Sequence, residues 1–199
     1  MSDAAPKIRR REPPEARRAQ ILEAALRCFA EKGYHVATMD DLVRASGLSK
    51  GSLYWHFRSK EEVFLAAFDL VAEELFAVWD RLSVDGGSTL DAVEEIFESK
   101  LLHGMLEGDL RAAWSEFFAH PQARERLAEM YRRIRARIEE SLLRDAERGL
   151  VRDLPPAGAA AAITAVGEGL MLQAMVDVNF DLRGMWPTTL AVLRRGIAS

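Results

Sequence analysis

The residues with the clearest capacity for chemistry lie in one short stretch, GLSKGSLYWHFRSKEE, at positions 47–62. It combines lysines, hydroxyl groups, a tyrosine and a histidine with a thin apolar stripe of Leu48, Leu53 and Phe57. Ammonium, hydroxyl and imidazole groups donate hydrogen bonds to phosphate oxygens and to the edges of bases. Because the stretch is too polar for a core segment, it favours a contact with nucleic acid.

The same residue types do not form a catalytic or metal-binding pattern. The histidines lack HExxH spacing, EFFAH supplies a single ExxxH pair, and no phosphate-binding loop, GxGxxG or GxSxG is present. Cys28 is the only cysteine, which excludes an internal disulfide and a cysteine-ligated metal, and we expect it in the core. We therefore expect no enzymatic activity, no metal and no cofactor.

Two short predicted helices present these polar residues. Thr38 with Asp41 has the pattern of a capping box that opens one helix, and Gly47 ends that helix. Ser49 opens a second helix that runs to about Phe57. Two helices joined by a tight glycine turn have the spacing of a helix-turn-helix, whose second helix lies in the major groove with its leading residues against the bases.

The second helix carries most of the expected DNA contacts. Lys50 can reach guanine acceptors, Gly51 allows close approach of the backbone, and Ser52 can donate to a base or a phosphate. Tyr54 and His56 carry polar tips that suit phosphate oxygens, and Lys60, at the start of the next helix, adds a positive charge. The full set of expected DNA-binding residues is Thr38, Arg44, Ser49, Lys50, Gly51, Ser52, Tyr54, Trp55, His56 and Lys60.

Several of these side chains have a structural alternative. The indole of Trp55 can bury its apolar area against the following helix, and His56 can cap a helix end. Lys50, Lys60 and Arg44 can be ordinary solvated charges.

At these positions the sequence resembles the TetR family of transcriptional regulators. Thr38, Gly47 and the run SKGSLYWHFRSKEE match the family pattern, and the match covers about residues 17–64. Val43 stands where a small residue is usual, and Asp40 stands where some members place a basic residue that contacts a base. The resemblance implies an all-helical homodimer of about nine helices, with a DNA-binding head, a ligand-binding body, and dimerisation through the last two long helices.

The rest of the chain also predicts helices, separated by proline, glycine and polar loops. We expect an all-α chain with a basic mobile arm at 1–14, a helix-turn-helix DNA-binding domain at 15–58, and a ligand-binding and dimerisation domain at 59–199. The expected helices cover about 15–32, 38–46, 49–57, 59–82, 88–106, 109–120, 121–148, 157–178 and 187–196. Ser59 with Glu62 and Ser88 with Asp91 have the capping-box pattern at the starts of two of them.

The charge of the chain is divided unevenly. Residues 1–60 hold 12 Lys and Arg against 7 Asp and Glu, and residues 61–199 hold 15 against 24, so +5 and −9 give the net −4. Phosphate binding requires only a local positive surface, which the basic head can supply. The basic residues at 7–11 can track the minor groove or phosphates, or can serve only as a solubilising tail.

The sequence lacks an N-terminal apolar run that resembles a signal peptide. It also lacks an uninterrupted run of about 18 uncharged apolar residues, the length that a membrane-spanning helix requires. We therefore expect no membrane span and a cytoplasmic location.

Aromatic and methionine residues are the candidates for a ligand cavity in the body. As a set they suit an apolar ligand, although core packing explains any single one at least as well. Glu168, Gln173 and His103 are polar residues in apolar surroundings, and each can orient a ligand or make a structural hydrogen bond. The candidate set is Phe68, Phe76, Trp79, Phe97, Leu101, His103, Met105, Trp114, Phe117, Phe118, Met130, Tyr131, Glu168, Met171, Gln173 and Met175.

The sequence thus predicts a homodimeric repressor that binds a pseudo-palindromic double-stranded DNA operator. A small apolar or amphipathic effector of unknown identity would release it from the operator. Two alternatives stay open, namely a helical dimeric interaction module that does not read an operator, and a ligand-independent regulator or activator.

Overall fold

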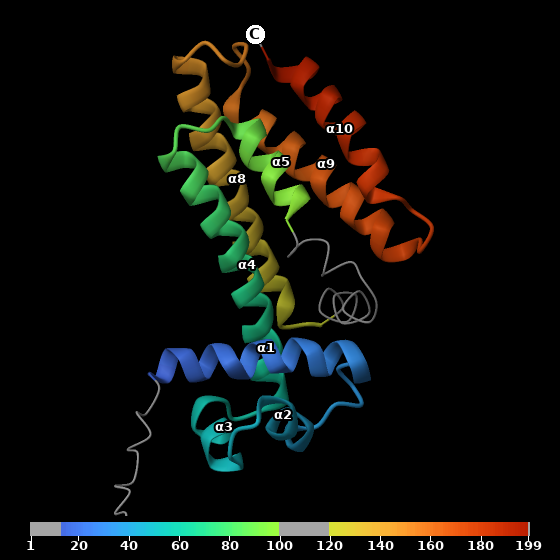
Figure 1. Cartoon of the computed structure of the whole chain (residues 1–199). Helices are drawn as coiled ribbons and strands as arrows, with labels where there is room; N and C mark the ends of the chain where they lie inside the picture. Colours follow the sequence, from blue (N-terminus) through green and yellow to red (C-terminus); the bar gives the residue numbers. More distant parts are fainter. Residues whose placement is uncertain (1–12, 100–119, 199) are drawn as a thin grey trace, which may run out of the picture.

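The computed structural model of the chain describes residues 13–99 and 120–198, arranged as a small head below a longer helical body (Figure 1). The arm expected at 1–14 lies almost entirely outside the described residues, and so does the helix expected at 109–120. The helices, labelled as in Figure 1, are α1 (Pro14–Lys32), α2 (Met39–Ser46), α3 (Lys50–His56), α4 (Lys60–Val84), α5 (Thr89–Glu98), α8 (Ala123–Glu147), α9 (Pro156–Val176) and α10 (Leu182–Ile197).

The expected all-α class is confirmed. Within the described residues, the only extended pairing is an isolated bridge between Val151 and Ala198, which ties the α8–α9 loop to the end of α10. Every other described element is a helix, in keeping with the near absence of alternating apolar and polar residues in the sequence.

Two of the predicted capping boxes form completely. The Thr38 hydroxyl accepts from the Asp41 backbone N–H at 3.2 Å, and the Asp41 carboxylate accepts from the Thr38 N–H at 2.9 Å. Ser88 and Asp91 make the same reciprocal pair at the start of α5, at 3.2 and 3.0 Å. Each box satisfies backbone donors that the first helical turn leaves without partners.

The box expected at the start of α4 is only half formed. The Ser59 hydroxyl accepts from the Glu62 N–H at 3.1 Å, as expected. The Glu62 carboxylate, however, accepts from the N–H of Arg58 at 2.8 Å and not from that of Ser59. The start of α4 is therefore capped by the Ser59 hydroxyl, while the Glu62 carboxylate binds the backbone of Arg58, the residue before the cap.

Two expected helix ends are wrong. The helix expected to run to about 106 ends at Glu98, where Ser99 leaves the helical conformation and its hydroxyl donates to the carbonyl of Ile96 at 2.7 Å. The last helix starts at Leu182, before Pro187, because the Asp181 carboxylate caps it by accepting from the Gly184 N–H at 2.9 Å. Pro187 therefore lies inside the helix and forgoes one backbone bond.

The head is held together by apolar side chains from four helices. In Figure 1, α1 crosses beneath the body, and α2 and α3 lie below it. The core combines fully buried Ile21 and Leu22 of α1, Leu42 of α2, Leu53 of α3 and Phe64 of α4. The first turns of α4 thus belong to the same core as α1, α2 and α3.

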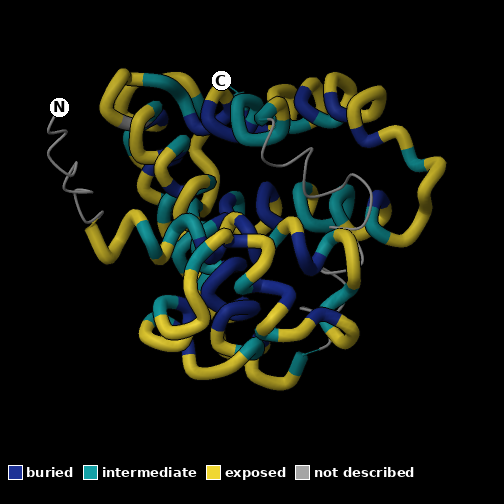
Figure 2. Tube along the Cα trace, turned by 60° about the horizontal axis from the view of Figure 1, so that its bottom comes forward, coloured by how far each residue is buried: buried dark blue, intermediate teal, exposed yellow. Residues whose placement is uncertain are grey.

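The body has a second core between α4, α5, α8, α9 and α10. Trp79, Ile138, Ile163 and Trp186 are among its buried members. Figure 2 shows buried segments inside the head and along the inner sides of the body helices, with exposed turns outside. The structure therefore has two cores, a compact one in the head and a larger one in the body, and α4 contributes to both.

Candidate DNA-binding surface and ligand cavity

The turn between α2 and α3 depends on Gly47. This residue has φ +67° and ψ 12°, a left-handed conformation that costs little only for glycine. Its N–H donates to the carbonyl of Val43 at 3.1 Å, which closes α2. The turn lets buried Leu53 anchor α3 on the head core while the opposite face of α3 points outward.

The leading turn of α3 is open. Lys50 and Gly51 are exposed and Ser52 is half-buried. A Cβ added at Gly51 would meet no atom within 4 Å, so nothing in the described protein covers this position. Ser49 is the N-cap, and its hydroxyl accepts from the Ser52 N–H at 3.2 Å. The open surface is of the kind that a helix needs in order to enter a major groove.

The aromatic residues of α3 also face solvent. Trp55 is 73% exposed and Tyr54 is 43% exposed, so the alternative in which Trp55 packs against α4 does not hold. The Trp55 ring meets only the half-buried ring of His56 edge-on, at 4.5 Å between centroids. Of these side chains, Tyr54 lies nearest to Lys50, whose Nζ is 6.0 Å from the centroid of the Tyr54 ring.

Lys50 is paired across the two helices. Its Nζ lies 2.9 Å from Oδ1 of Asp40, and both side chains are mostly exposed. The hydrogen bond to Asp40 raises the pKa of Lys50, so its positive charge is secure at neutral pH. Because an exposed ion pair contributes little free energy, Lys50 can exchange Asp40 for a base or a phosphate at small cost.

Lys60 is not available to DNA in this structure, which corrects the expected phosphate contact. Its Nζ donates to the carbonyl oxygens of Tyr34, His35 and Ala37 at 2.6, 3.2 and 2.8 Å. The ammonium also lies 4.5 Å from the centroid of the Tyr34 ring. All three N–H donors of an ammonium are thus used inside the protein. Lys60 ties the start of α4 to the loop between α1 and α2.

Arg44 and Thr38 surround a buried carboxylate. Asp41 is 8% exposed and binds Lys32 at 2.5 Å, the Thr38 hydroxyl at 2.6 Å, and Arg44. The hydrogen bond from Lys32, followed by those from Thr38 and Arg44, holds the pKa of Asp41 far below its usual value. Thr38 is exposed, and most of the Arg44 side chain is too. Both are therefore accessible from solvent.

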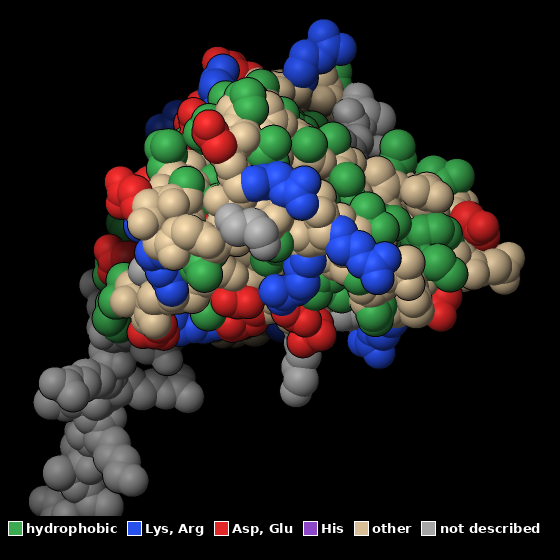
Figure 3. Space-filling model, turned by 90° about the horizontal axis from the view of Figure 1, so that it is seen from above, with side chains coloured by type: hydrophobic (Ala, Val, Ile, Leu, Met, Phe, Trp, Pro, Cys, Tyr) green, Lys and Arg blue, Asp and Glu red, His purple; other side chains and the backbone are tan. Residues whose placement is uncertain are grey.

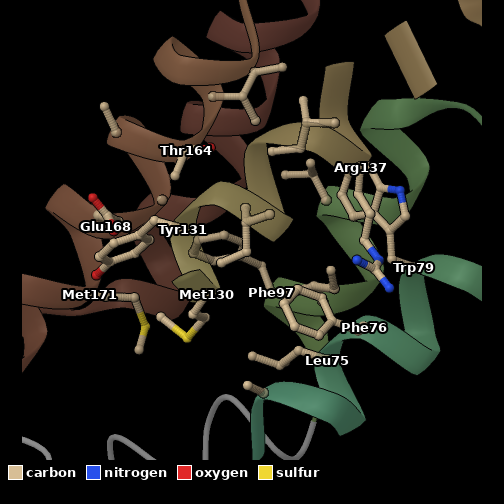
Figure 4. A pocket seen from close by; sticks show the side chains of 18 of the residues that line it. Leu75, Phe76, Trp79, Phe97, Met130, Tyr131, Arg137, Thr164, Glu168 and Met171 are labelled. Carbon is tan, nitrogen blue, oxygen red and sulfur yellow. The ribbon is translucent and has the colours of Figure 1, made fainter. Parts of the chain in front are cut away.

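The body encloses a cavity of about 600 Å³ between α4, α5, α8 and α9 (Figure 4). Volumes of this size are typical of sites for small organic ligands. Eight of the candidate ligand residues line it, namely Phe76, Trp79, Phe97, Met130, Tyr131, Glu168, Met171 and Met175.

Two candidate ligand residues lie elsewhere. Phe68 belongs to the core shared with the head, where its ring meets that of Phe64 at 4.9 Å between centroids. Gln173 is exposed on α9, and its amide donates to the carbonyl of Gly169 at 3.1 Å. The remaining candidates fall outside the described residues, namely Leu101, His103, Met105, Trp114, Phe117 and Phe118.

The sequence analysis missed part of the lining. Ile134, Arg137 and Ile138 continue the face of α8 that starts at Met130 and Tyr131. Their spacing of three and four residues along the helix could have identified them. Thr164, on α9, lies one turn before Glu168 and also lines the cavity, and its hydroxyl donates to the Ala160 carbonyl at 2.8 Å.

The polar end of the cavity is formed by Tyr131 and Glu168. Burial, together with a hydrogen bond to the Glu168 carboxylate, raises the pKa of Tyr131 well above its ordinary value. Tyr131 therefore stays protonated and donates to Glu168. Oε1 of Glu168 is buried and lacks a hydrogen-bond partner among the described residues.

Helices α9 and α10 expose an apolar outer face. On α9, Ala162, Val166 and Val176 point away from the bundle, and on α10, Met185 and Val192 do the same. By length and composition α9 could cross a membrane, although the charged residue Glu168 lies within it. A single such helix is weak evidence for a membrane span, since interface helices have the same composition.

Two sequence families match the chain. Residues 21–67 match bacterial regulatory proteins of the tetR family, and residues 110–198 match the C-terminal part of BetI-type transcriptional repressors. The first match covers most of the head and the start of α4, and the second covers most of the body after α5.

Curated relatives agree with these matches. The chain is 31% identical over 151 residues to the HTH-type transcriptional repressor AcnR of Corynebacterium efficiens, covering 71% of this chain and 73% of AcnR. It is 45% identical over 71 residues to the HTH-type transcriptional repressor Rv1474c of Mycobacterium tuberculosis, but that match covers only 36% of this chain and 38% of Rv1474c.

A solved structure shares the whole fold. SmeT, the repressor of the Stenotrophomonas maltophilia multidrug efflux pump SmeDEF, superposes with a TM-score of 0.71 at 25% sequence identity. The superposition covers 94% of this chain and 93% of SmeT. The similarity therefore extends over both head and body.

Proposed function

Because the chain belongs to the TetR family of bacterial regulatory proteins and is a DNA-binding transcriptional regulator rather than an enzyme, we propose that it represses transcription from a pseudo-palindromic operator. The observation that carries this proposal is the open leading turn of α3, where Lys50, Gly51 and Ser52 face outward. These three residues would meet the base edges, and a second group would contact phosphates, namely Thr38, Arg44, Tyr54, Trp55 and His56.

A homodimer would place two α3 helices on one face of the duplex. A two-fold dimer matches half-sites about one helical turn apart, roughly 34–36 Å, or slightly more. The exposed apolar face of α9 and α10 is the surface that we assign to dimerisation. Pairing with the same face of a second copy would bury it and explains the apolar composition of α9 without a membrane. This agrees with a cytoplasmic location.

Successive segments of the chain are assigned different roles. We assign residues 1–14 to a basic arm, 15–58 to DNA binding, and 59–199 to ligand binding and dimerisation. Figure 3 shows the end of the body farthest from the head, where acidic and basic side chains are interspersed. Such a mixed surface is a poor binding site for phosphates, which favours the head as the DNA-binding end.

The cavity would hold a small effector that releases the operator. Helix α4 connects the two sites, because Phe64 lies in the core of the head while Phe76 and Trp79 line the cavity. An effector that binds more tightly to a dimer whose heads do not match the half-site spacing would favour that state and lower the affinity for the operator. A coupling of about 1–3 kcal/mol is enough for a useful switch.

A gel shift at stated salt concentration tests the proposal. The probe is DNA that flanks the chain's own coding region, with an unrelated duplex of equal length as competitor. We expect a specific complex with the wild-type protein and none with Gly51→Leu, because the added side chain would stand between backbone and groove. The space around Gly51 is open, so the thermal melt of this variant should match the wild type or lie slightly higher.

Ala136→Leu, on an exposed part of α8, is the matched control and should bind like the wild type. Wild-type affinity in Gly51→Leu would reject the close approach of α3 to the duplex. A wild-type protein that binds both duplexes equally well would argue for a non-specific role.

A further inference from the structure

The described lining of the cavity has few polar side chains. Besides Tyr131 and Glu168, only Arg137 and Thr164 carry polar groups there. The Thr164 hydroxyl is already engaged with the Ala160 carbonyl within α9. The charge that a ligand would meet is therefore decided by Arg137 and Glu168.

Arg137 is already neutralised. Its Nε and Nη2 donate to the two carboxylate oxygens of Asp80 at 3.0 and 3.2 Å. Its guanidinium also lies 4.4 Å from the centroid of the Phe76 ring. Figure 4 places it beside Trp79 and Phe76, on the far side of the cavity from Glu168. An anionic ligand would have to compete with Asp80 for this cation.

Among the described residues, Glu168 has no such compensation. The described part of the chain offers it one neutral donor, the Tyr131 hydroxyl, and no ion pair with a lysine, arginine or histidine. In Figure 4 its carboxylate lies beside the Tyr131 ring at one end of the cavity. An uncompensated carboxylate in apolar surroundings is costly, and a cation placed against it removes that cost.

We infer that the effector is a lipophilic cation: a protonated amine whose N–H group donates to the carboxylate of Glu168, which lines the cavity, and whose apolar body fills the remaining space. The rings of Tyr131 and Phe97 add faces on which a cation is attracted. The methionines at 130, 171 and 175 adapt to the shape of the apolar part. This inference rests on the proposed function of the cavity as the effector site.

Three probes with one apolar chain and different heads test the charge preference. Decylammonium, decanol and decanoate are titrated into the full-length dimer by calorimetry, below the concentrations at which they form micelles. We expect decylammonium to bind more tightly than decanol, and decanoate to bind most weakly. A hydrogen bond to a charged group corresponds to about a tenfold to hundredfold difference in affinity.

Glu168→Gln keeps the shape of the side chain and removes its charge. We expect it to lose the tenfold to hundredfold preference for decylammonium while its affinity for decanol stays near the wild-type value. The matched control is Glu74→Gln, which removes the same charge from an exposed position of α4 that does not line the cavity, and it should keep the preference. A thermal melt confirms that both variants are folded.

Several outcomes would overturn the inference: tighter binding of decanol or decanoate to the wild type, a cation preference that survives in Glu168→Gln, or no binding of decylammonium. The calorimetry needs no DNA, so its result is separate from that of the gel shift. A cation preference in a protein that forms no operator complex would support the cavity chemistry and reject the proposed function. If decanol or decanoate binds best and releases the operator, the result would support the proposed function and reject the cation inference.

Discussion

At the scale of single residues, two lysines close to the DNA-binding surface have opposite environments. Lys50 is exposed and held only by the exposed carboxylate of Asp40, whereas Lys60 is enclosed by three carbonyl oxygens and the ring of Tyr34. The first can change partners when DNA arrives, and the second cannot do so without opening the loop between α1 and α2. Residue type alone does not separate these roles.

Lys60→Ala should therefore destabilise the protein, by about 1–2 kcal/mol, because it removes charge-assisted hydrogen bonds and a cation–π contact. Urea unfolding measures the loss. Lys50→Ala serves as the comparison and should leave stability almost unchanged, since its ion pair is exposed, while relaxing the base preference in a binding-site selection. Unchanged stability in Lys60→Ala, with weaker binding to every sequence, would restore the phosphate role for Lys60.

At the scale of the elements, helix ends are decided by side chains from distant parts of the chain as well as by neighbours. The Asp145 carboxylate of α8 is 1% exposed and accepts from the Thr89 N–H at the start of α5, at 2.7 Å. Ser88 already caps the same helix from the adjacent position. The start of α5 thus has two acceptors, one local and one supplied by the core.

Asp145→Ala should reduce the free energy of unfolding by about 1.5–3 kcal/mol, because it leaves a buried N–H without its charged acceptor. Chemical denaturation followed by circular dichroism gives the value. Glu147→Ala, at the exposed end of the same helix, should stay within about 0.5 kcal/mol of the wild type. Equal effects of the two substitutions would mean that Ser88 alone holds the start of α5.

Helix α4 is further connected to α8 by ion pairs along its length. Arg133 binds Glu73 at 2.6 Å, and Arg137 binds Asp80 through two hydrogen bonds. Each exposed pair contributes little to stability, but a series along two helices fixes their register. The pairs hold α4 in the position that orients α2 and α3, and Arg137 connects this series to the lining of the cavity.

At the scale of the whole molecule, the outer face of α9 and α10, as the proposed dimer interface, would decide whether two heads can act together. Its small and apolar residues are exposed in the single chain, which favours close helix packing against a second copy. A dimer supplies the two α3 helices that a pseudo-palindrome requires. The effector cavity lies directly inside this face, since α9 contributes to both.

Ala162→Arg should convert the dimer to a monomer, because a charged and bulky side chain would be placed in the proposed interface. Sedimentation velocity measures the change in mass, and operator affinity should fall with it. Ala136→Arg introduces the same side chain on an exposed face of α8 and should remain dimeric. A dimer that persists in Ala162→Arg would exclude this face of α9 as the centre of the interface.

The sequence by itself determined the helical class and the head of this protein. The caps at Thr38 and Ser49, the left-handed turn at Gly47, and the apolar rhythm that buries Leu53 all act between residues close in the chain. Local interactions of this kind leave a readable pattern, and the structure shows the predicted helices within one or two residues there. The open face of α3 follows from that pattern.

Only the tertiary structure decided which side chains meet the cavity, the head core or the solvent. Phe68 and Phe76 have the same type and lie on one apolar face of α4, yet one packs into the head core and the other lines the cavity. Glu168 and Gln173 are both polar residues of α9, yet only Glu168 lies beside Tyr131. The environment of a side chain depends on residues far away in the sequence, and the periodicity along one helix does not show which distant residues pack against it.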